Sequence, residues 1–410
     1  MRSSHHFYRI AFARVVFARV VFARIAVALA VAACSDPDGP SPDSGAPAAA
    51  QIFERFVSLG TSNSMGVQSA GIFAASQRAA WPSQLASRVG VSFSMPLVQD
   101  PGCGPPLEAP LATNLALIAT LGQGIISVVR DTCAPLASGV TLPTNSVAIS
   151  GANVHDALVA TPESEQARNA RVGVLYSRVL APGQTQVSAM LAQKPTFVSV
   201  ELAANDVLPA STGRVTALTP YADWERDYDA VIAAVKSTGA RAVLVGLPND
   251  ATEFPSIRRA REFSDEAAAL VALGVRVTAD CANSSNYLFV PGYLLTAVAS
   301  APATVTCADT PGAVDYVLTA ADIVTINAQM TRMNAHMRAK AAEHGYAYFS
   351  LDAVYGLPKP AFRVSDLLLS NTPFGPTISL DGVHPSTAGQ ALLASAAAQA
   401  INAAYGTSIR

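Results

Sequence analysis

Two serines near the start of the folded part of the chain, and an aspartate and a histidine near its end, are the residues best suited to chemistry. Ser62 and Ser64 follow a glycine in the stretch FVSLGTSNSMG (residues 56–66), and Asp381 and His384 lie three residues apart before a final helical pattern. A serine hydroxyl becomes an effective nucleophile only when an adjacent base, such as histidine, removes its proton. An aspartate can hold that histidine in the required tautomer. These residue types therefore predict a hydrolytic site, in which either serine could be the nucleophile.

Short apolar segments between residues 51 and 410 indicate the strands that would position these side chains. They are apolar throughout, as strands covered on both faces are, and helix-like segments alternate with them. This alternation predicts an α/β fold with three layers, α/β/α, around an open, mostly parallel sheet of about five strands. The expected strands are Phe56–Leu59, Ser146–Ser150, Thr196–Leu202, Ala242–Leu247 and Tyr346–Leu351. The main expected helices are Tyr221–Ser237, Ser256–Leu273, Ala320–His344 and Ser386–Ala404.

Small or amide-bearing residues follow three of the expected strands. The first strand ends in Gly60-Thr61-Ser62, the second in Gly151-Ala152-Asn153 and the third in Ala203-Ala204-Asn205-Asp206. In an open parallel sheet, ligands bind at the carboxyl ends of the strands. We therefore expect these three segments to lie on one rim, where a substrate would bind.

Together with Asp381-Gly382-Val383-His384, the three strand ends resemble the four sequence blocks of the SGNH, or GDSL, hydrolase family, in the family's order. The resemblance covers essentially the whole folded domain and implies the flavodoxin-like fold of that family. It places Ser62, and not Ser64, on the serine nucleophile. It also implies that Asp381 and His384 complete a catalytic triad with Ser62.

The same resemblance implies an oxyanion hole, the group of donors that stabilises the tetrahedral intermediate. Its donors would be the backbone N–H groups of Ser62 and Gly151 and the side-chain amide of Asn205. Two residues depart from the family's pattern. Thr61 stands where aspartate is usual, which bears on the geometry of the turn, and Ala203 replaces a glycine, which adds a methyl group where the backbone can need an unusual φ.

Asp206, which completes the third block, is expected to have a structural role, hydrogen-bonding the turn that follows the first strand. His155 and Asp156 follow Gly151 and could imitate a catalytic pair, but adjacent positions on a helix point apart. We expect His336 and His344, which lie on the long helical segment, to be solvated.

Each candidate also has a structural interpretation. Ser62 could cap the helix that follows it, a frequent role of serine. Gly151 and Asn205 could be ordinary turn residues, and Asp381 and His384 could belong to a surface turn before the last helix.

The resemblance implies a serine hydrolase that acts on carboxylic esters, possible lipid acyl esters among them, and that requires no metal and no cofactor. Two apolar segments, 97–129 and 286–298, interrupt the alternation of strands and helices. They could form an apolar acyl pocket or lid, or additional core. Two alternatives stay open: a carbohydrate acetylesterase, and a surface lipoprotein of the same fold that binds lipid or glycan without turnover.

The N-terminal segment has the features of an export signal. Residues 1–33 begin with scattered arginines and end in an uncharged apolar run that is shorter than the roughly 20 residues a membrane span needs. Val31-Ala32-Ala33-Cys34 resembles the lipobox of bacterial lipoproteins, so Cys34 is the expected lipidation site, although a buried or disulfide-bonded Cys34 is the alternative. Residues 34–50 are rich in Pro, Ser, Asp and Gly and predict a linker before the domain at 51–410. We therefore expect a lipid-anchored protein of the bacterial cell envelope, with the membrane and an ester substrate as its partners.

The remaining four cysteines support export. The simplest pairing joins Cys103 with Cys133 and Cys281 with Cys307, which lie close in sequence. A metal site is the weaker interpretation, because no C-x-x-C motif is present and no histidine stands at ligand spacing. The formal net charge of −2, with half of the residues apolar, allows a large core and argues against a nucleic-acid partner.

Overall fold

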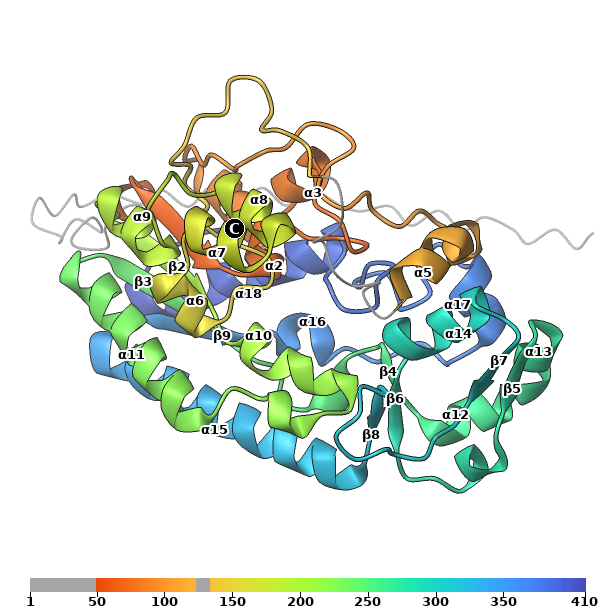
Figure 1. Cartoon of the computed structure of the whole chain (residues 1–410). Coiled ribbons are helices and arrows are strands. Elements are labelled where there is room, and N and C mark those ends of the chain that lie inside the picture. Colours follow the sequence, from red (N-terminus) through yellow and green to blue (C-terminus); the bar gives the residue numbers. More distant parts are fainter. Residues whose placement is uncertain (1–48, 123–132) are drawn as a thin grey trace, which may run out of the picture. The chain divides into compact units, whose positions relative to one another are not determined.

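A four-stranded parallel sheet lies at the centre of the residues that the computed structural model describes, 49–122 and 133–410. Its strand order is β1-β2-β3-β9, so each strand after the first is added on the same side (Figure 1). The bounds are β1 Phe56–Gly60, β2 Phe197–Glu201, β3 Arg241–Gly246 and β9 Ala347–Ser350. The expected signal segment 1–33, Cys34 and the linker up to residue 48 lie outside the described residues.

Successive side chains of these strands enter two separate apolar clusters. Val57 and Leu59 belong to one cluster, whereas Phe56 belongs to the other. The same alternation holds in β3, where Leu244 packs on the first side and Val243 on the second. Side chains of a strand point alternately to opposite faces, so the sheet is covered on both sides and the predicted α/β/α class is confirmed.

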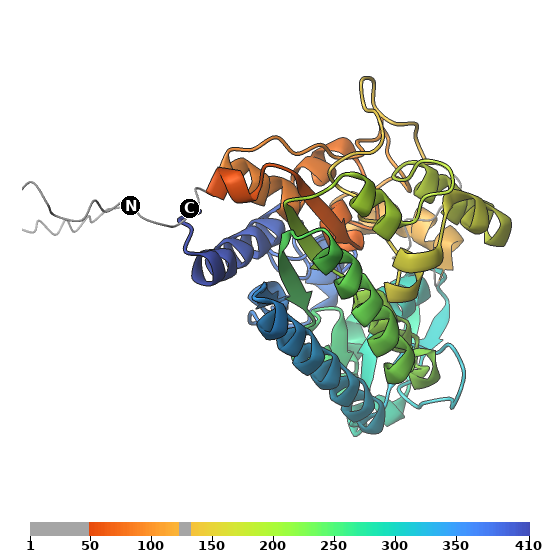
Figure 2. The same cartoon turned by 90° about the vertical axis from the view of Figure 1, so that its left-hand side faces the viewer.

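Helices form the two outer layers, and Figure 2 shows α18 on one side of the sheet and α11 and α15 on the other. The layer with α11 and α15 contains α6 Val154–Val159, α7 Pro162–Arg168, α8 Ala170–Ser177, α9 Gln186–Ala192, α11 Tyr221–Ser237 and α15 Ala320–His344. The opposite layer contains α1 Ala49–Ile52, α4 Trp81–Val89, α16 Asp352–Tyr355 and α18 Thr387–Tyr405. Short helices in the connections are α2 Ser62–Met65, α3 Ala74–Arg78, α10 Ala204–Val207, η3 Leu208–Thr212, η4 Val215–Ala217 and η5 Ala251–Glu253.

Three of the four main helices begin and end where the sequence indicates. α11 and α15 have the predicted bounds, and α18 begins after Ser386, whose hydroxyl accepts a hydrogen bond from the Gly389 N–H. At the start of α15, Thr319 and Asp322 form the capping box that the sequence suggests, in which each side chain bonds the backbone N–H of the other.

The second expected strand is only partly formed. Ser146 pairs with Ser58 as an isolated parallel bridge, and the N–H groups of Val147 and Ile149 donate to the Ser58 and Gly60 carbonyls. This segment therefore extends the sheet beyond β1, but it makes no continuous ladder of its own.

The expected helix Ser256–Leu273 is wrong in its first part. Ile257–Arg259 forms strand β4, which pairs antiparallel with β6, and the helical part is split into α12 Ala260–Asp265 and α13 Ala267–Ala272. Pairing with β6 overrides the helical pattern, because this strand belongs to a small accessory region that local sequence does not reveal. That region contains β4 Ile257–Arg259, β6 Tyr287–Phe289, β8 Val317–Leu318, β5 Val275–Val277, β7 Ala303–Val305, η6 Ala279–Ala282, η7 Pro291–Leu295, α14 Thr296–Ala299 and α17 Val364–Leu369.

The two apolar insertions meet each other beside this accessory region. The first contributes η1 Leu111–Asn114 and α5 Leu115–Leu121, and the second contributes β6, η7 and α14. α5 packs against α14, and the Thr296 hydroxyl donates to the Gly122 carbonyl. Residues 123–129 of the first insertion lie outside the described residues.

Both predicted disulfides are present. Cys103 is bonded to Cys133 and Cys281 to Cys307.

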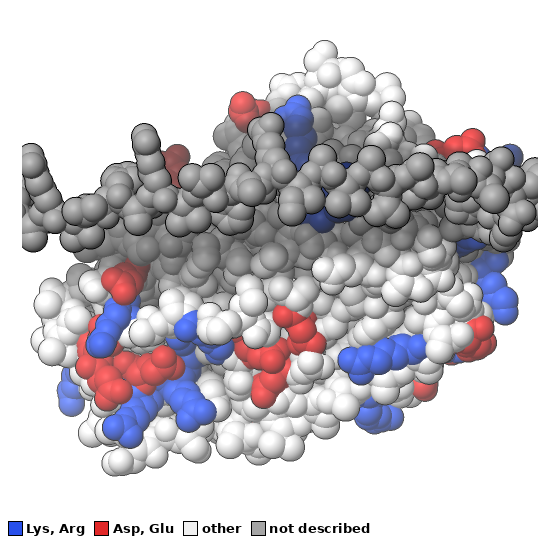
Figure 3. Space-filling model, turned by 180° about the vertical axis from the view of Figure 1, so that it is seen from behind, with Lys and Arg blue, Asp and Glu red and all other residues white. Residues whose placement is uncertain are grey.

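Figure 3 shows acidic and basic side chains mixed over one face of the molecule, with wide uncharged areas between them. Among the described helices, none combines the length and apolar character needed to span a membrane.

Candidate active site

Ser62 lies on a tight turn, residues 60–66, between β1 and α2, which we call the serine turn. It is the first residue of α2 and is 8 % exposed. The turn is closed by Gly66, whose φ of +85° is in the left-handed region and whose N–H donates to the Ser62 carbonyl. At the other end, a Cβ on Gly60 would lie 2.6 Å from Ser64 Oγ, so only glycine leaves room for the chain to fold back.

Asp381 and His384 lie on a second turn, residues 379–385, which we call the histidine turn. His384 Nδ1 lies 2.8 Å from Asp381 Oδ2, and both side chains are buried. Asp381 also accepts hydrogen bonds from the N–H groups of Val383 and His384, from the Ser379 hydroxyl and from the Ala70 N–H. Burial alone would raise the pKa of this carboxyl, but the neighbouring His384 and the N–H donors hold the pKa below its ordinary value.

A tyrosine from α16 fixes the histidine turn from outside. The Tyr355 hydroxyl donates to the Val383 carbonyl at 2.6 Å, and the ring of Tyr355 is 2 % exposed. Burial raises the pKa of this phenol well above its usual range, so it remains a donor. Tyr355 is not among the residues expected from the sequence.

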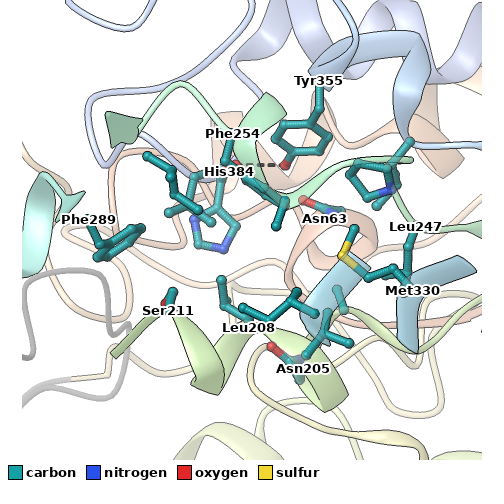
Figure 4. A pocket seen from close by; sticks show the side chains of 18 of the residues that line it. Asn63, Asn205, Leu208, Ser211, Leu247, Phe254, Phe289, Met330, Tyr355 and His384 are labelled. Atoms are coloured by element: carbon teal, nitrogen blue, oxygen red, sulfur yellow. Dashed lines mark hydrogen bonds between the residues drawn. The ribbon is translucent and has the colours of Figure 1, made fainter. Parts of the chain in front are cut away.

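Ser62 and His384 line the same cavity, which is partly open to solvent. Figure 4 shows His384 and Asn205 between Phe289 on one side and Met330 on the other. Among the described residues, neither Ser62 Oγ nor His384 Nε2 has a hydrogen-bond partner. The cavity walls are Ser62, Asn63, Ala204, Asn205, Val207, Leu208, Ser211, Leu247, Pro248, Ala251, Phe254, Ile257, Phe289, Leu318, Ile326, Met330, Leu351, Tyr355, Val383 and His384.

The walls of this cavity are mostly apolar. Among the described residues that line it, His384 is the only one of the Asp, Glu, Lys, Arg and His types, and six of these described side chains are polar. The accessory strands contribute Ile257, Phe289 and Leu318, so this region borders the site. Of the described parts of the two apolar insertions, only Phe289 lines the cavity, and the rest of them forms core or surface.

The expected oxyanion residues do not all reach the cavity. Asn205 lines it, and its side-chain amide donates to the Ala152 carbonyl at 2.8 Å, which leaves the second amide hydrogen for another acceptor. Gly151 has a φ of +85°, as a turn glycine does, but it is exposed and is not part of the cavity wall.

Ala203 has the unusual conformation that its place in the sequence suggests. Its φ of +137° lies in a region that residues with a Cβ rarely adopt, and the residue is buried at the start of α10. Strain of this kind costs about 1–3 kcal/mol and persists only where the surroundings enforce it.

Asp206 has a structural role, as expected, but its predicted partner is wrong. Its carboxylate accepts from the Val154 N–H at 3.2 Å, which ties it to the start of α6, and it has no contact with the serine turn among the described hydrogen bonds. Burial raises the pKa of Asp206 to about 7. The side chain points to the second strand end because Asn205 and Asp206 lie at the start of α10, next to the segment that follows Ile149.

His155 and Asp156 do not form a pair. His155 Nδ1 lies 2.9 Å from Asp227, whereas Asp156 completes a capping box with Asn153.

The expectation that His336 and His344 are solvated is wrong. The His336 side chain is 14 % exposed and bonds Asp229 at 2.7 Å, because α11 packs along α15 and covers it. The His344 side chain is 10 % exposed and lies 3.7 Å from Glu343.

A buried glutamate that the sequence analysis missed lies under the serine turn. Glu201, the last residue of β2, is 2 % exposed and accepts hydrogen bonds from Thr61 and Ser64. A charged residue inside the apolar run FVSVEL (residues 197–202) was the available signal, because a buried carboxylate needs specific partners.

Ser64 points away from the cavity. Its hydroxyl lies 3.0 Å from Glu201 Oε2 and accepts a hydrogen bond from the Trp81 indole N–H at 3.1 Å. Ser64 is fully buried by these contacts, whereas Ser62 faces the cavity.

Within the described residues, one group of potential metal ligands lies close together: Asp280, Cys281 and Cys307. Both sulfurs are joined in a disulfide, and the Asp280 carboxylate accepts from the Cys307 N–H. This group therefore closes a loop with a disulfide, which the hydrogen bond from Cys307 to Asp280 supports. Cys34, the expected lipidation site, lies outside the described residues.

Comparisons with known proteins give one strong similarity. The family model described as GDSL-like lipase/acylhydrolase matches residues 56–397. A comparison with curated proteins finds no match. Among solved structures, a mutant of an acetyl-xylooligosaccharide esterase from Geobacillus Stearmophilus is 12 % identical over 87 % of this chain and 95 % of that chain, with a TM-score of 0.34. An extracellular lipase from Streptomyces rimosus is 16 % identical over 83 % of this chain and 98 % of that chain, with a TM-score of 0.30.

Proposed function

Because the chain belongs to the GDSL-like lipase/acylhydrolase family of serine ester hydrolases, we propose that it cleaves carboxylic esters with Ser62 as nucleophile, His384 as base and Asp381 as the orienting carboxylate. The observation that carries the proposal is that Ser62 and His384 line one cavity while Asp381 bonds the Nδ1 side of the imidazole. This hydrogen bond directs Nε2, the other ring nitrogen, to serve as the base.

In the proposed reaction, His384 Nε2 takes the proton of Ser62 Oγ as that oxygen attacks the ester carbonyl. The tetrahedral intermediate then collapses, the C–O bond to the alcohol breaks, and the imidazolium protonates the departing alcohol. Water, deprotonated by the same imidazole, hydrolyses the acyl-serine. We propose the Ser62 N–H and the free amide hydrogen of Asn205 as donors to the oxyanion; Gly151 is proposed from the sequence pattern alone.

We propose an apolar acyl chain for the substrate. The part of the cavity that the described residues line beside Ser62 consists mainly of aliphatic and aromatic side chains, and His384 is its only acidic or basic residue. Each methylene buried there would contribute about 0.8 kcal/mol, which corresponds to roughly a fourfold gain in kcat/KM per carbon until the cavity is filled. A sugar would find few of the polar partners that its hydroxyl groups require.

A phosphonate ester probe tests the nucleophile. Intact-mass analysis and peptide mapping should place the adduct on Ser62, with no adduct on Ser62→Ala and normal labelling of Ser64→Ala. Labelling that persists in Ser62→Ala would contradict the assignment.

A series of nitrophenyl esters from acetyl to dodecanoyl tests the acyl group. Activity confined to the acetyl ester, or release of acetate from acetylated xylan, would support a carbohydrate acetylesterase instead. If no ester were turned over while lipid or glycan still bound, the non-catalytic lipoprotein would be the better interpretation.

We also propose that the protein is exported and anchored to a membrane by lipid on Cys34. Two formed disulfides are typical of an oxidising compartment outside the cytoplasm, which supports export. The anchor can be tested with Cys34→Ala in the full-length protein. Its transfer from the membrane fraction to the soluble fraction is the expected result, and its retention after a high-salt wash would exclude the anchor.

A further inference from the structure

Glu201 is a buried acid with no cation beside it. It lies at the end of β2, opposite Gly60 in the register, and within the described residues it forms no ion pair. Its hydrogen bonds go to the serine turn, which is separated from it by about 140 residues of chain. An acid enclosed in this way is costly unless its oxygens are well bonded, so the contacts of this carboxylate deserve a functional explanation.

One carboxylate oxygen holds the serine turn on both sides of Ser62. Glu201 Oε2 accepts from the Thr61 N–H at 3.0 Å and from the Ser64 N–H at 3.2 Å. These N–H groups are at the start of α2, where a helix leaves its donors without partners. The Thr61 side chain makes no capping bond of its own, so Glu201 supplies the cap from the neighbouring strand.

The hydroxyl groups of the turn add two further contacts. Thr61 Oγ1 lies 2.8 Å from Glu201 Oε1, and Ser64 Oγ lies 3.0 Å from Oε2. The Trp81 N–H donates to Ser64 Oγ, so the Ser64 hydroxyl is free to donate its own hydrogen to Glu201. The hydrogen bonds from Trp81 to Ser64 and from Ser64 to Glu201 thus run in one direction. They fix Ser64, which lies two positions after Ser62.

Gly60, the first residue of the serine turn, makes this approach possible. A Cβ on Gly60 would lie 3.2 Å from Glu201 Oε2, in addition to its clash with Ser64. Gly60 therefore leaves the space in which the carboxylate reaches the turn.

We infer that Glu201 is a positioning residue, whose carboxylate holds the serine turn so that Ser62 Oγ faces the cavity and the Ser62 N–H is directed at the oxyanion. This inference rests on the proposed function, because it assigns Glu201 a role through Ser62. Glu201 does not line the cavity, and it acts on the rate of the chemical step rather than on substrate binding.

Replacement of the carboxylate separates this role from general support of the fold. Glu201→Ala removes the shared acceptor, and misplacement of the nucleophile should lower kcat by about 100-fold while KM stays within about twofold. Glu201→Gln keeps one oxygen that can accept from both N–H groups, so it should retain kcat to within about tenfold. Rates are measured per active site, titrated with the phosphonate probe, alongside the melting temperature.

A matched control is Glu165→Gln. Glu165 is also buried, at 4 % exposure, but it lies on α7, where it bonds Arg168. It should leave kcat and KM unchanged, whatever its effect on the melting temperature. A kcat for Glu201→Ala within about threefold of the wild type, or a rise in KM without a fall in kcat, would overturn the inference.

If Glu201→Ala does not fold, the double variant Thr61→Val with Ser64→Ala decides the question. It leaves the carboxylate in place and removes two of its donors, which should lower kcat about tenfold at constant KM. An unchanged kcat in this variant would reject the role. Ser62→Ala separates failure of this inference from failure of the proposed function. If Ser62→Ala is inactive and Glu201 is dispensable, only the inference about Glu201 fails. If Ser62→Ala is active, the proposed function itself is wrong.

Discussion

The histidine turn and the serine turn each depend on a buried carboxylate, but the pKa values of these two groups shift in opposite directions. Asp381 is fully buried, yet its pKa is lowered, because His384 and several N–H donors surround it. Glu201 is 2 % exposed, and its pKa is raised, since burial outweighs the hydrogen bonds from Thr61 and Ser64. The difference follows from the partner: one carboxylate has a histidine that can become a cation, and the other has none.

The two turns also differ in how far their supports lie along the chain. Asp381 bonds residues two and three positions ahead of it, and the Ala70 N–H and the Tyr355 hydroxyl add distant contacts to these local ones. The serine turn is held by a residue of another strand and by Trp81. The pairing of Asp381 with His384 is therefore local in sequence, whereas the carboxylate that supports the serine turn comes from another strand of the assembled sheet.

The largest effect is expected when either side chain of the proposed Ser62–His384 pair is removed. Ser62→Ala and His384→Ala should each lower turnover of a good ester by about 10⁶, and the double variant should be no worse than either, because the two residues would act as one unit in the proposed mechanism. Initial rates on a nitrophenyl ester check this. Ser64→Ala is the control and should lose less than about tenfold, since its hydroxyl bonds Glu201 and not the substrate. Multiplying losses in the double variant would mean that the two turns act independently.

The next comparison is the pH dependence of stability in two isosteric variants. The pKa of Asp381 is lowered on folding, so its stabilising contribution is present above about pH 3.9, the pKa of an unfolded aspartate, and is lost as the pH falls through the folded value. The advantage of the wild type over Asp381→Asn should therefore shrink as the pH is lowered below about 5.

Glu201 should give the opposite trend. Its pKa is raised on folding, so its contribution is complete below about pH 4.3, the unfolded value, and is lost as the pH rises through the folded value. The free energy of unfolding of Glu201→Gln, relative to the wild type, should therefore increase as the pH rises. Urea unfolding of the three proteins from acid to neutral pH gives, for each variant, the free energy of unfolding of the wild type minus that of the variant. This difference should rise with pH for Asp381→Asn and fall with pH for Glu201→Gln, and slopes of the same sign would contradict the contrast between the two carboxylates.

The smallest effect concerns Ala203. This residue lies two positions after Glu201, the residue of β2 that supports the serine turn. Ala203→Gly should stabilise the protein by about 1 kcal/mol, because glycine adopts a φ of +137° without strain and this gain exceeds the entropy that glycine loses on folding. Thermal unfolding measures the change. Ala204→Gly, at the first residue of α10, is the matched control and should be neutral or destabilising. A destabilised Ala203→Gly would show that the methyl group is needed for packing.

The sequence is sufficient to predict features whose partners lie close along the chain. The alternation of apolar strands with helices predicts the three layers, and the capping residues give the bounds of α15. Asp381 and His384 are found because their spacing places both on one turn.

Features that arise from distant contacts were missed or misassigned. β4 is a strand only because it pairs with β6, about thirty residues further along, and its own sequence has a helical pattern. Asp206 was expected at the serine turn, but Glu201 occupies that place, since the end of β2 lies opposite Gly60. The choice between two neighbouring acids depends on strand register, which a single sequence does not define.

Trp81 provides a built-in optical probe of the serine turn. The chain has two tryptophans, and both are fully buried, so their fluorescence is shielded from water. The indole of Trp81 bonds Ser64, whereas that of Trp224 stacks on Tyr228 between α11 and α15. With Trp224 replaced by phenylalanine, emission from the remaining indole would report the arrangement around Ser62, the proposed nucleophile, during turnover, without any attached label.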